Sequence, residues 1–600
     1  MKAILAILAI ALPCLAQPPA KPAKPPDYKK LAQTRVTGVF DSISKEADFT
    51  RATKDLTTLL DELIAYAPDG ETDAFREADF GLRLVTQLSQ LTNGRVDLLT
   101  YLRANPELAQ ALVFQIQQED KIAGVYGLLD KLRKKHGTEL NKLASLTAAV
   151  CVVHDQPLVD QVNENTSKAA DPVQIFDFFK SHQGSMHFPL TSMPPELLIF
   201  VVNTTASIDD LNWALNKYAG DARVNRRYSE VHYDKAYFRG QAEKKVTVAG
   251  FNLPSILKNG GVCADQSYFA QQVGKAIGIP TAGISGRNAS MAHAWVGFFE
   301  VVTEKPRWNF DAGHYEGYEN VRGSTLDPQT RQTIPDSALC LIADTSISGA
   351  ANRRAAIAMT DASLRLAAIQ KSKLPFPPTG ETVIPIRNPA RHADIAARLE
   401  LLEAGLRKSP ALAQGWNLIS SSATELSLKD KQHWATVLDT LCGAKNPDFS
   451  LAILTAMIQT IPNIKDQDTF WSSLFGTYQK RPDLAAEIRF CQGGMWEKSG
   501  DKGKAWVCYE DVFKRFPNEG PFAVDAAQRC EKLMKDGGKN EGASALYAAL
   551  WPRMERPGAS IAPEFKQQSN WYRVGRLYAS SLEAEGNLPM AESVKKQLDR

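Results

Sequence analysis

Cys263 is the residue best placed for covalent chemistry, because it follows Asn259-Gly260-Gly261 and opens a run of helical periodicity. Apolar residues recur at helical spacing over residues 262–277, and Gly278-Ile279-Pro280 ends the run. The thiol therefore lies in the first turn of a predicted helix, where free backbone amides and the helix dipole stabilise an anion. We expect this thiol to ionise more easily than a free one and to act as a nucleophile.

A thiolate nucleophile needs a proton acceptor and donor, and His293 is the candidate. His293 begins a strand-like run, AHAWVGFFEVV, and a hairpin signal follows at 304–306. The next run, RWNFD, is expected to return antiparallel and to bring Asp311 near His293. A carboxylate on one imidazole nitrogen would fix the tautomer and leave the other nitrogen facing the thiol.

An oxyanion hole would complete such a site, and the backbone N–H of Cys263 is its first predicted donor. The second donor should come from upstream, with Tyr228 as the candidate and Gln241 or Asn259 as alternatives. His314 is a rival base, but it lies in a glycine-rich loop.

Neighbouring residues are expected to support the site. Gly260 and Gly261 would leave room for a substrate to approach the backbone. Asp265 is assigned to the helix start and Trp295 to packing beneath the histidine strand.

The elements that position these residues belong to a segment of mixed α and β character, residues 216–345. Short β-branched and aromatic runs typical of strands occur at 244–251, 280–285 and 293–302, with the Cys263 helix between them. Residues 28–215, by contrast, have helical periodicity throughout.

The remainder of the chain is predicted to be helical. Residues 346–390 are proline-rich towards their end and are interpreted as a linker, and residues 391–600 as helical repeats. The clearest repeat unit runs from Arg489 to Pro517, with a first helix ending near Lys498 and a second reaching Phe516.

The chain begins with an export signal, predicted over residues 1–16, followed by a proline-rich linker at 17–27. A periplasmic or extracellular location follows, and soluble export is favoured over lipid anchoring at Cys14 because Pro13 precedes that residue. Seven cysteines remain after cleavage, an odd number that is compatible with one reactive thiol. The others are interpreted as buried, unpaired thiols.

Composition argues against several classes of partner. Lys and Arg total 70 against 67 Asp and Glu, so the charge gives no reason to expect nucleic acid or an anionic membrane. The sequence shows no glycine-rich phosphate loop, no Cys/His cluster at metal-ligand spacing, and no other stretch of transmembrane length. We expect no cofactor and no metal.

Four ordered elements together resemble the transglutaminase-like superfamily, whose core has a papain-like fold: Gly261-Val262-Cys263, Gly278-Ile279-Pro280, His293-Ala294-Trp295 and Asp311. The match covers about 90 residues. It implies an α+β core, which periodicity places after an N-terminal all-α region and repeat spacing places before a C-terminal tetratricopeptide-like region. It also implies that Cys263, His293 and Asp311 form a catalytic triad. Ala264 stands where eukaryotic transglutaminases and papain-type proteases carry Trp, which argues against a eukaryote-type crosslinking enzyme.

These observations predict an exported thiol enzyme of acyl transfer that acts on peptide or amide bonds through a thioester, with hydrolysis favoured. A transglutaminase-type crosslinking enzyme is one alternative. The other is a non-catalytic scaffold whose helical repeats bind protein partners.

Overall fold

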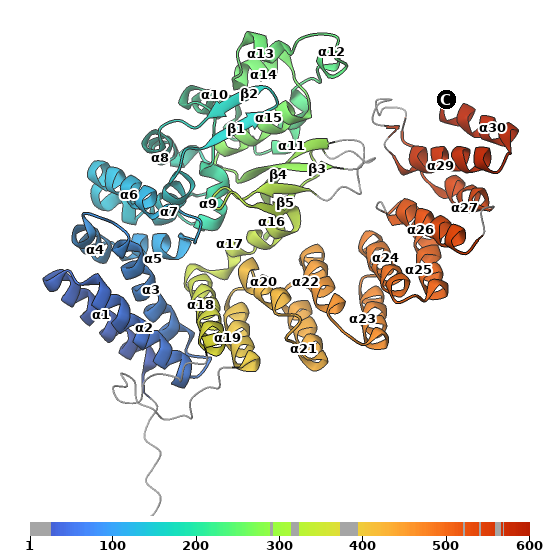
Figure 1. The fold of residues 1–600 in the computed structure, drawn as a ribbon. Coiled ribbons are helices and arrows are strands. Elements are labelled where there is room, and N and C mark those ends of the chain that lie inside the picture. Colours follow the sequence, from blue (N-terminus) through green and yellow to red (C-terminus); the bar gives the residue numbers. More distant parts are fainter. Residues whose placement is uncertain are drawn as a thin grey trace, which may run out of the picture.

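The computed structural model describes residues 26–287, 292–313, 323–372, 394–443, 445–519, 522–538, 542–558, 566–567 and 569–599. The predicted export signal and most of the predicted first linker therefore lie outside the described residues, as do His314 and residues 373–393. The described chain is mostly helical and contains a small, curled five-stranded sheet. Figure 1 shows N-terminal helices at one side, the sheet in the middle, and C-terminal helices arranged as an arc.

The N-terminal region is a stack of helices interrupted by one short hairpin. Its helices are α1 (Tyr28–Glu46), α2 (Phe49–Tyr66), α3 (Thr72–Ser89), α4 (Arg95–Ala104), α5 (Pro106–Gln115), α6 (Ile122–His136), α7 (Ala144–Val153), α8 (Pro172–Ser181), α9 (Pro195–Val202) and α10 (Ile208–Tyr218). The hairpin joins β1 (Val159–Val162) to β2 (Asn165–Lys168) in antiparallel register.

The central region contains the helix of Cys263 and the larger sheet. Its helices are α11 (Val224–Glu230), α12 (Lys235–Phe238), α13 (Lys245–Ala249), α14 (Leu253–Asn259), α15 (Cys263–Ala276), α16 (Asp336–Ala343) and α17 (Thr345–Ser348). Its strands are β3 (Thr281–Arg287), β4 (Ala292–Val302), β5 (Lys305–Asn309), β6 (Ser324–Leu326) and β7 (Thr333–Pro335). The strand order is β5-β4-β3-β6-β7, and each neighbouring pair is antiparallel.

The predicted hairpin after the histidine strand is confirmed. Strand β4 pairs with β5 from Phe298↔Asn309 to Val302↔Lys305. Thr303 and Glu304 both have positive φ, 50° and 64°, as a tight two-residue hairpin requires. The predicted helix from Cys263 is also present as α15.

One predicted strand is wrong, because residues 245–249 of the run 244–251 form helix α13. The run meets the β1–β2 hairpin through side chains, since Asn165 Nδ2 donates to Thr247 Oγ1 at 3.0 Å and Thr247 Oγ1 donates to Glu164 Oε1 at 2.7 Å. β propensity without a backbone ladder does not make a strand. The preceding residue, Lys244, is buried in an ion pair with Asp265, which fixes where α13 starts.

The C-terminal region consists of antiparallel helices that follow one another along the arc. They are α18 (Ala350–Ser372), α19 (Ile395–Lys408), α20 (Ala413–Ser421), α21 (Leu428–Leu438), α22 (Pro447–Gln459), α23 (Ile464–Thr477), α24 (Pro482–Lys498), α25 (Lys502–Arg515), α26 (Phe522–Asp536), α27 (Ala543–Leu550), α29 (Asn570–Ala584) and α30 (Leu588–Leu598). Helices α24 and α25 coincide with the two helices expected between Arg489 and Pro517. Gly493 lets them approach closely, since a Cβ there would lie 2.6 Å from the Tyr509 ring.

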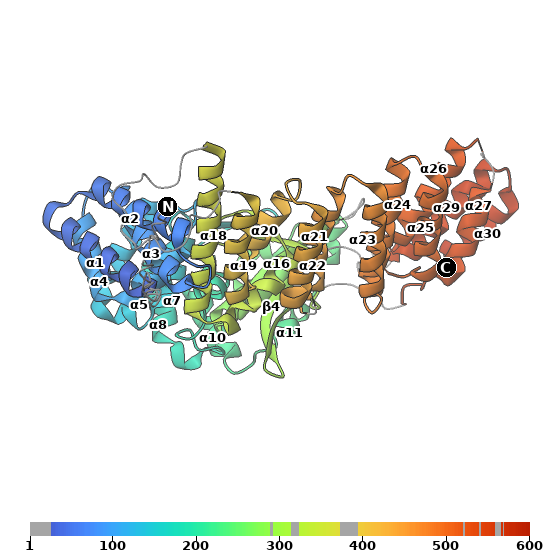
Figure 2. The same ribbon diagram turned by 90° about the horizontal axis from the view of Figure 1, so that it is seen from below.

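Helix α18 occupies much of the range expected to be a linker and packs on the N-terminal helices. Arg365 on α18 pairs with Asp61 on α2, and Asp361 pairs with Arg83 on α3. The buried side chains form two clusters, one reaching from Tyr28 to Leu401 and one from Leu341 to Val594. The N-terminal helices, the sheet and α18 thus share one core, and the arc has its own. The arc runs away from the rest of the molecule in the second view (Figure 2).

Candidate functional site

Cys263 occupies the first position of α15, and the helix start is held by Asp265. The Val262 N–H donates to Asp265 Oδ2 at 2.8 Å, and Asp265 Oδ1 lies 2.7 Å from Lys244 Nζ. The side chains of Asp265 and Lys244 are 0% and 1% exposed. The helix-start role predicted for Asp265 is therefore confirmed, and this buried ion pair joins the nucleophile's helix to the segment that precedes α13.

The sulfur of Cys263 is surrounded by backbone N–H groups. Those of Ala294, Ala264 and Cys263 itself favour the thiolate and lower the thiol pKa. Burial acts more strongly in the opposite direction and the Asp265 carboxylate adds to it, so the pKa of Cys263 lies above its ordinary value. The expectation of an easily ionised thiol is wrong for this structure, because desolvation outweighs the amides at the helix start.

His293 is the second residue of β4. The N–H facing the sulfur belongs to Ala294, the next residue along the strand. The His293 side chain is buried, and its Nε2 is 2.7 Å from the carbonyl oxygen of Gly313. A carbonyl only accepts, so Nε2 carries a proton.

Trp295 packs against His293, as predicted. It is 1% exposed, and its ring stacks on the imidazole at 5.8 Å between centroids with an interplanar angle of 23°. The two side chains share one face of β4 because they are two residues apart.

Asp311 lies two residues beyond the end of β5, and its side chain is exposed. The pairing of β4 with β5 ends at Phe298↔Asn309, and beyond it the Val296 N–H donates to the carbonyl oxygen of Ala312, the residue after Asp311, at 3.3 Å. The hydrogen bond at His293 Nε2 is made by Gly313, so the group that holds the imidazole here is a backbone carbonyl. The orienting role of Asp311 stays a prediction.

Tyr228 is buried on α11 beside the same strand. Its hydroxyl donates to the carbonyl oxygen of Ala294 at 2.9 Å, and its ring packs against Gly313. Gly313 has φ +85°, and a Cβ there would lie 2.4 Å from the Tyr228 ring. Tyr228 thus binds the carbonyl of Ala294, the residue whose N–H lowers the thiol pKa, and its oxyanion-hole role remains a prediction.

The two alternative oxyanion donors are placed differently. Asn259 donates its side-chain amide to the carbonyl and hydroxyl oxygens of Ser255, each at 3.0 Å. Gln241 is exposed in the loop between α12 and α13. Neither amide is recorded in contact with Cys263.

The space beside the two glycines before Cys263 is filled by protein. A Cβ on Gly260 would lie 2.5 Å from the His232 ring, and a Cβ on Gly261 would lie 2.4 Å from Asp265 Cβ. Gly260 also has φ +78°. The expectation that these glycines leave room for a substrate is wrong, because the side chains of His232 and Asp265 occupy the space beside them.

Sequence reasoning missed Lys244, Gly313 and the backbone of Ala294. Gly313 follows Asp311 by two positions, and a glycine just past a predicted strand was a usable turn signal. Lys244 carried no local signal, since its partner lies 21 positions away in a different element.

Within the described residues, no group of three or more His, Cys, Asp or Glu side chains could hold a metal ion. The same part of the chain has no helix long and apolar enough to span a bilayer. Its seven cysteines are all unpaired.

The sequence matches no protein-family model and no curated protein. The resemblance to the transglutaminase-like superfamily thus rests on the order and spacing of the residues around Cys263, His293 and Asp311.

Proposed function

We propose that this chain is an exported, cysteine-dependent enzyme of acyl transfer that acts on peptide or amide bonds. The observation that carries the proposal is the surroundings of Cys263. Its sulfur lies at the start of α15 among three backbone N–H groups, one of them from the residue after His293. His293 in turn is held by the Gly313 carbonyl with Nε2 protonated.

The reaction begins from the protonated thiol, because burial raises the pKa of Cys263. As the sulfur attacks the substrate carbonyl carbon, its proton passes to the imidazole of His293. The tetrahedral intermediate collapses to a thioester, the C–N bond breaks, and the leaving amine takes the proton from the imidazolium. Water then attacks the thioester with His293 as base, which releases the acid and restores the thiol.

Substituting the nucleophile tests the proposal. Cys263→Ser is expected to lose peptide hydrolysis, the thioester intermediate and iodoacetamide labelling at position 263. Cys340→Ser is the matched control, since Cys340 is a half-buried thiol on α16. Full turnover by Cys263→Ser would refute the assignment.

The orienting group requires its own variant. If Asp311 orients the imidazole, Asp311→Asn lowers kcat by 100-fold or more, as expected when a triad carboxylate is lost. A change below tenfold assigns that role to the Gly313 carbonyl. The ratio of kcat for wild type and variant, measured on one peptide substrate, decides between them.

The acceptor distinguishes hydrolysis from crosslinking. Hydrolysis is favoured because Ala264 follows Cys263, where crosslinking enzymes of the eukaryotic type carry Trp. With monodansylcadaverine present, a hydrolase releases the free acid and a transglutaminase forms the fluorescent amide.

The non-catalytic scaffold is the second candidate, and the exposed position of Asp311 favours it. In that function the C-terminal arc binds protein partners on its concave side, which Figure 1 shows turned towards the central region. An unlabelled Cys263 and a peptide-binding protein without turnover would support this candidate.

A further inference from the structure

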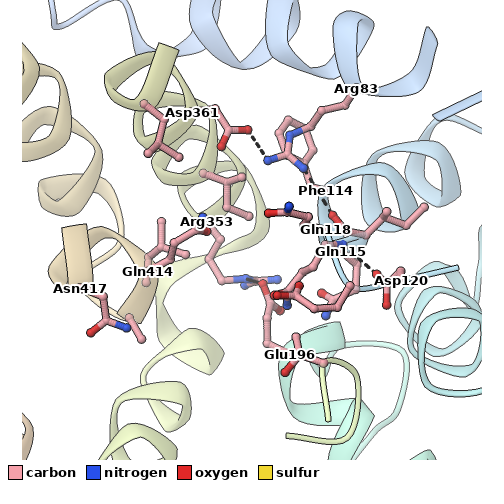
Figure 3. Close-up of a pocket in the computed structure, with 18 of the residues that line it drawn as sticks. Arg83, Phe114, Gln115, Gln118, Asp120, Glu196, Arg353, Asp361, Gln414 and Asn417 are labelled. Carbon is pink, nitrogen blue, oxygen red and sulfur yellow. Dashed lines mark hydrogen bonds and ion pairs between the residues drawn. The ribbon is translucent and has the colours of Figure 1, made fainter. Parts of the chain in front are cut away.

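A large cavity opens where the N-terminal helices meet the first helices of the C-terminal region (Figure 3). Its volume is about 1140 Å³, and its walls come from α3, the loop after α5, α18 and α20. Among the described residues, none of its lining comes from α15 or β4. The cavity is therefore separate from the Cys263 site.

The arginines in the walls are already paired with carboxylates of the protein. Arg83 binds Asp79 through Nε at 2.9 Å and also pairs with Asp361. Arg353 binds Glu196 at 3.0 Å. The arginines of the described lining are therefore neutralised towards an anionic ligand, and the exposed carboxylate of Glu119 accepts from the Gln332 amide at 2.9 Å.

The polar side chains of the cavity that are available to bind a ligand are carboxamides. Gln118, Gln414 and Asn417 are exposed, line the cavity, and have no side-chain hydrogen bond within the described part of the chain. Gln118 comes from the loop after α5, whereas Gln414 and Asn417 come from α20 on the opposite wall (Figure 3). Leu364 on α18 also lines the cavity and is 38% exposed.

A carboxamide offers two donors and one acceptor, the same groups that a peptide unit presents. Carboxamides on facing walls can therefore form hydrogen bonds with the N–H and C=O groups of an extended chain. The apolar side chains of the lining can contact the side chains of that bound chain. The volume exceeds the usual range for small-molecule sites of roughly 300–1,000 Å³. A sugar ring would stack on an exposed aromatic face, but the aromatic residue of the described lining, Phe114, is 5% exposed and lies under Arg83.

We propose that this cavity binds an extended, uncharged stretch of polypeptide through Gln118, Gln414 and Asn417. The site is additional to the proposed acyl-transfer centre. It would hold a protein at a place away from Cys263.

The test uses the full chain carrying Cys263→Ser, so that binding is measured without turnover and stands apart from the proposed enzyme activity. The probe is a fluorescently labelled, end-blocked peptide of Ser, Thr, Gln, Ala and Val residues, an extended polypeptide without charged side chains. Gln118→Ala/Asn417→Ala removes one amide from each wall. Gln432→Ala/Gln597→Ala is the control, because both residues are exposed and neither lines the cavity.

Fluorescence anisotropy should show saturable binding that the Gln118/Asn417 variant weakens at least tenfold and the control leaves unchanged. All three proteins should unfold at the same Tm, since only exposed side chains are altered. Equal affinity of the two double variants, or no binding by the parent chain, would overturn the proposal. Displacement of the probe by maltoheptaose would also overturn it and would assign the cavity to a glycan.

Discussion

At the scale of single residues, the electrostatics of the candidate site depend on Lys244. Its ammonium group lies 2.7 Å from Asp265 in a region closed to solvent, two positions along α15 from Cys263. The Asp265 carboxylate raises the pKa of the thiol, and the lysine offsets that negative charge. One buried cation therefore stabilises both the helix start and the thiolate.

Lys244→Met should leave Asp265 buried without its partner. A broken buried pair costs about 3–5 kcal/mol of unfolding free energy. The pKa of Cys263 should also rise further above its ordinary value, so the rate of iodoacetamide alkylation should climb at a higher pH than in wild type. Urea unfolding and the pH profile of alkylation measure the two effects.

Lys244→Met/Asp265→Asn is the matched variant, because it removes the charge together with its partner. The double variant should return the alkylation profile to that of wild type or below it. His293 on β4 and Tyr228 on α11 are unchanged in both variants. An identical alkylation profile for wild type and Lys244→Met would contradict this account.

At the scale of elements, the imidazole is held by the turn that follows β5. Gly313 has φ +85°, its carbonyl accepts from His293 Nε2, and the Tyr228 ring fills the space beside its Cα. The sheet thereby fixes the histidine through backbone geometry. This geometry requires glycine.

Gly313→Ala should therefore lower both stability and turnover. A Cβ would meet the Tyr228 ring at 2.4 Å and would add the strain of positive φ. We expect a loss of about 1–3 kcal/mol in unfolding free energy, the range for backbone strain at such positions. Gly220→Ala shares the positive φ, +81°, with nothing within 4 Å of its Cβ, and should cost less and leave turnover intact.

The far end of α15 is held to β3 by a buried lysine. Lys275 Nζ donates to Thr281 O at 2.6 Å, to Thr281 Oγ1 at 3.2 Å and to Phe200 O at 3.2 Å. Burial lowers the pKa of Lys275 from 10.5 to about 7. The unfolded chain thus binds more protons than the folded chain between about pH 7 and 10.5, so this group makes stability rise with pH across that window.

Lys275→Met should remove that dependence. The free energy of unfolding of wild type minus that of the variant should rise between pH 7 and pH 9, by at most about 1.4 kcal/mol per pH unit. Urea titrations of both proteins at the two pH values give the difference directly, and other titrating groups cancel in it. A difference that stays constant or falls would mean that Lys275 keeps its charge in the folded state.

At the scale of the whole molecule, α18 connects the first core to the C-terminal arc. Arg83 on α3 is shared between Asp79 of its own helix and Asp361 of α18, and burial raises the pKa of Asp79 to about 7. A second contact joins Arg365 of α18 to Asp61 of α2, and these side chains are 33% and 21% exposed. The two arginines attach the same helix, but only the Arg83 site includes a carboxylate that is nearly closed to solvent, Asp79 at 4% exposed.

Arg83→Met should destabilise the attachment of α18 more than Arg365→Met does. Removing Arg83 leaves two carboxylates facing each other in a largely buried place, which costs about 3–5 kcal/mol. Removing Arg365 breaks a partly solvated pair, which is worth about 1 kcal/mol or less. Urea unfolding monitored by tryptophan fluorescence compares them, and equal losses would contradict the burial argument.

The amino-acid sequence by itself determined the elements that carry the candidate chemistry. Helical periodicity and the Gly-Ile-Pro stop defined α15, alternation with a turn signal defined the β4–β5 hairpin, and glycine and aromatic spacing indicated the α24–α25 pair. Each of these depends on interactions between residues close in the chain. Local patterns suffice for such elements.

Only the tertiary structure decided what surrounds Cys263 and His293. The register of β5 brings the Gly313 carbonyl to His293 and leaves Asp311 exposed. Burial raises the pKa of the Cys263 thiol although the backbone amides at the helix start lower it, and residues 245–249 form a helix that meets the β1–β2 hairpin through side chains. Register, desolvation and the choice of partner depend on residues distant in sequence, and no local pattern contains them.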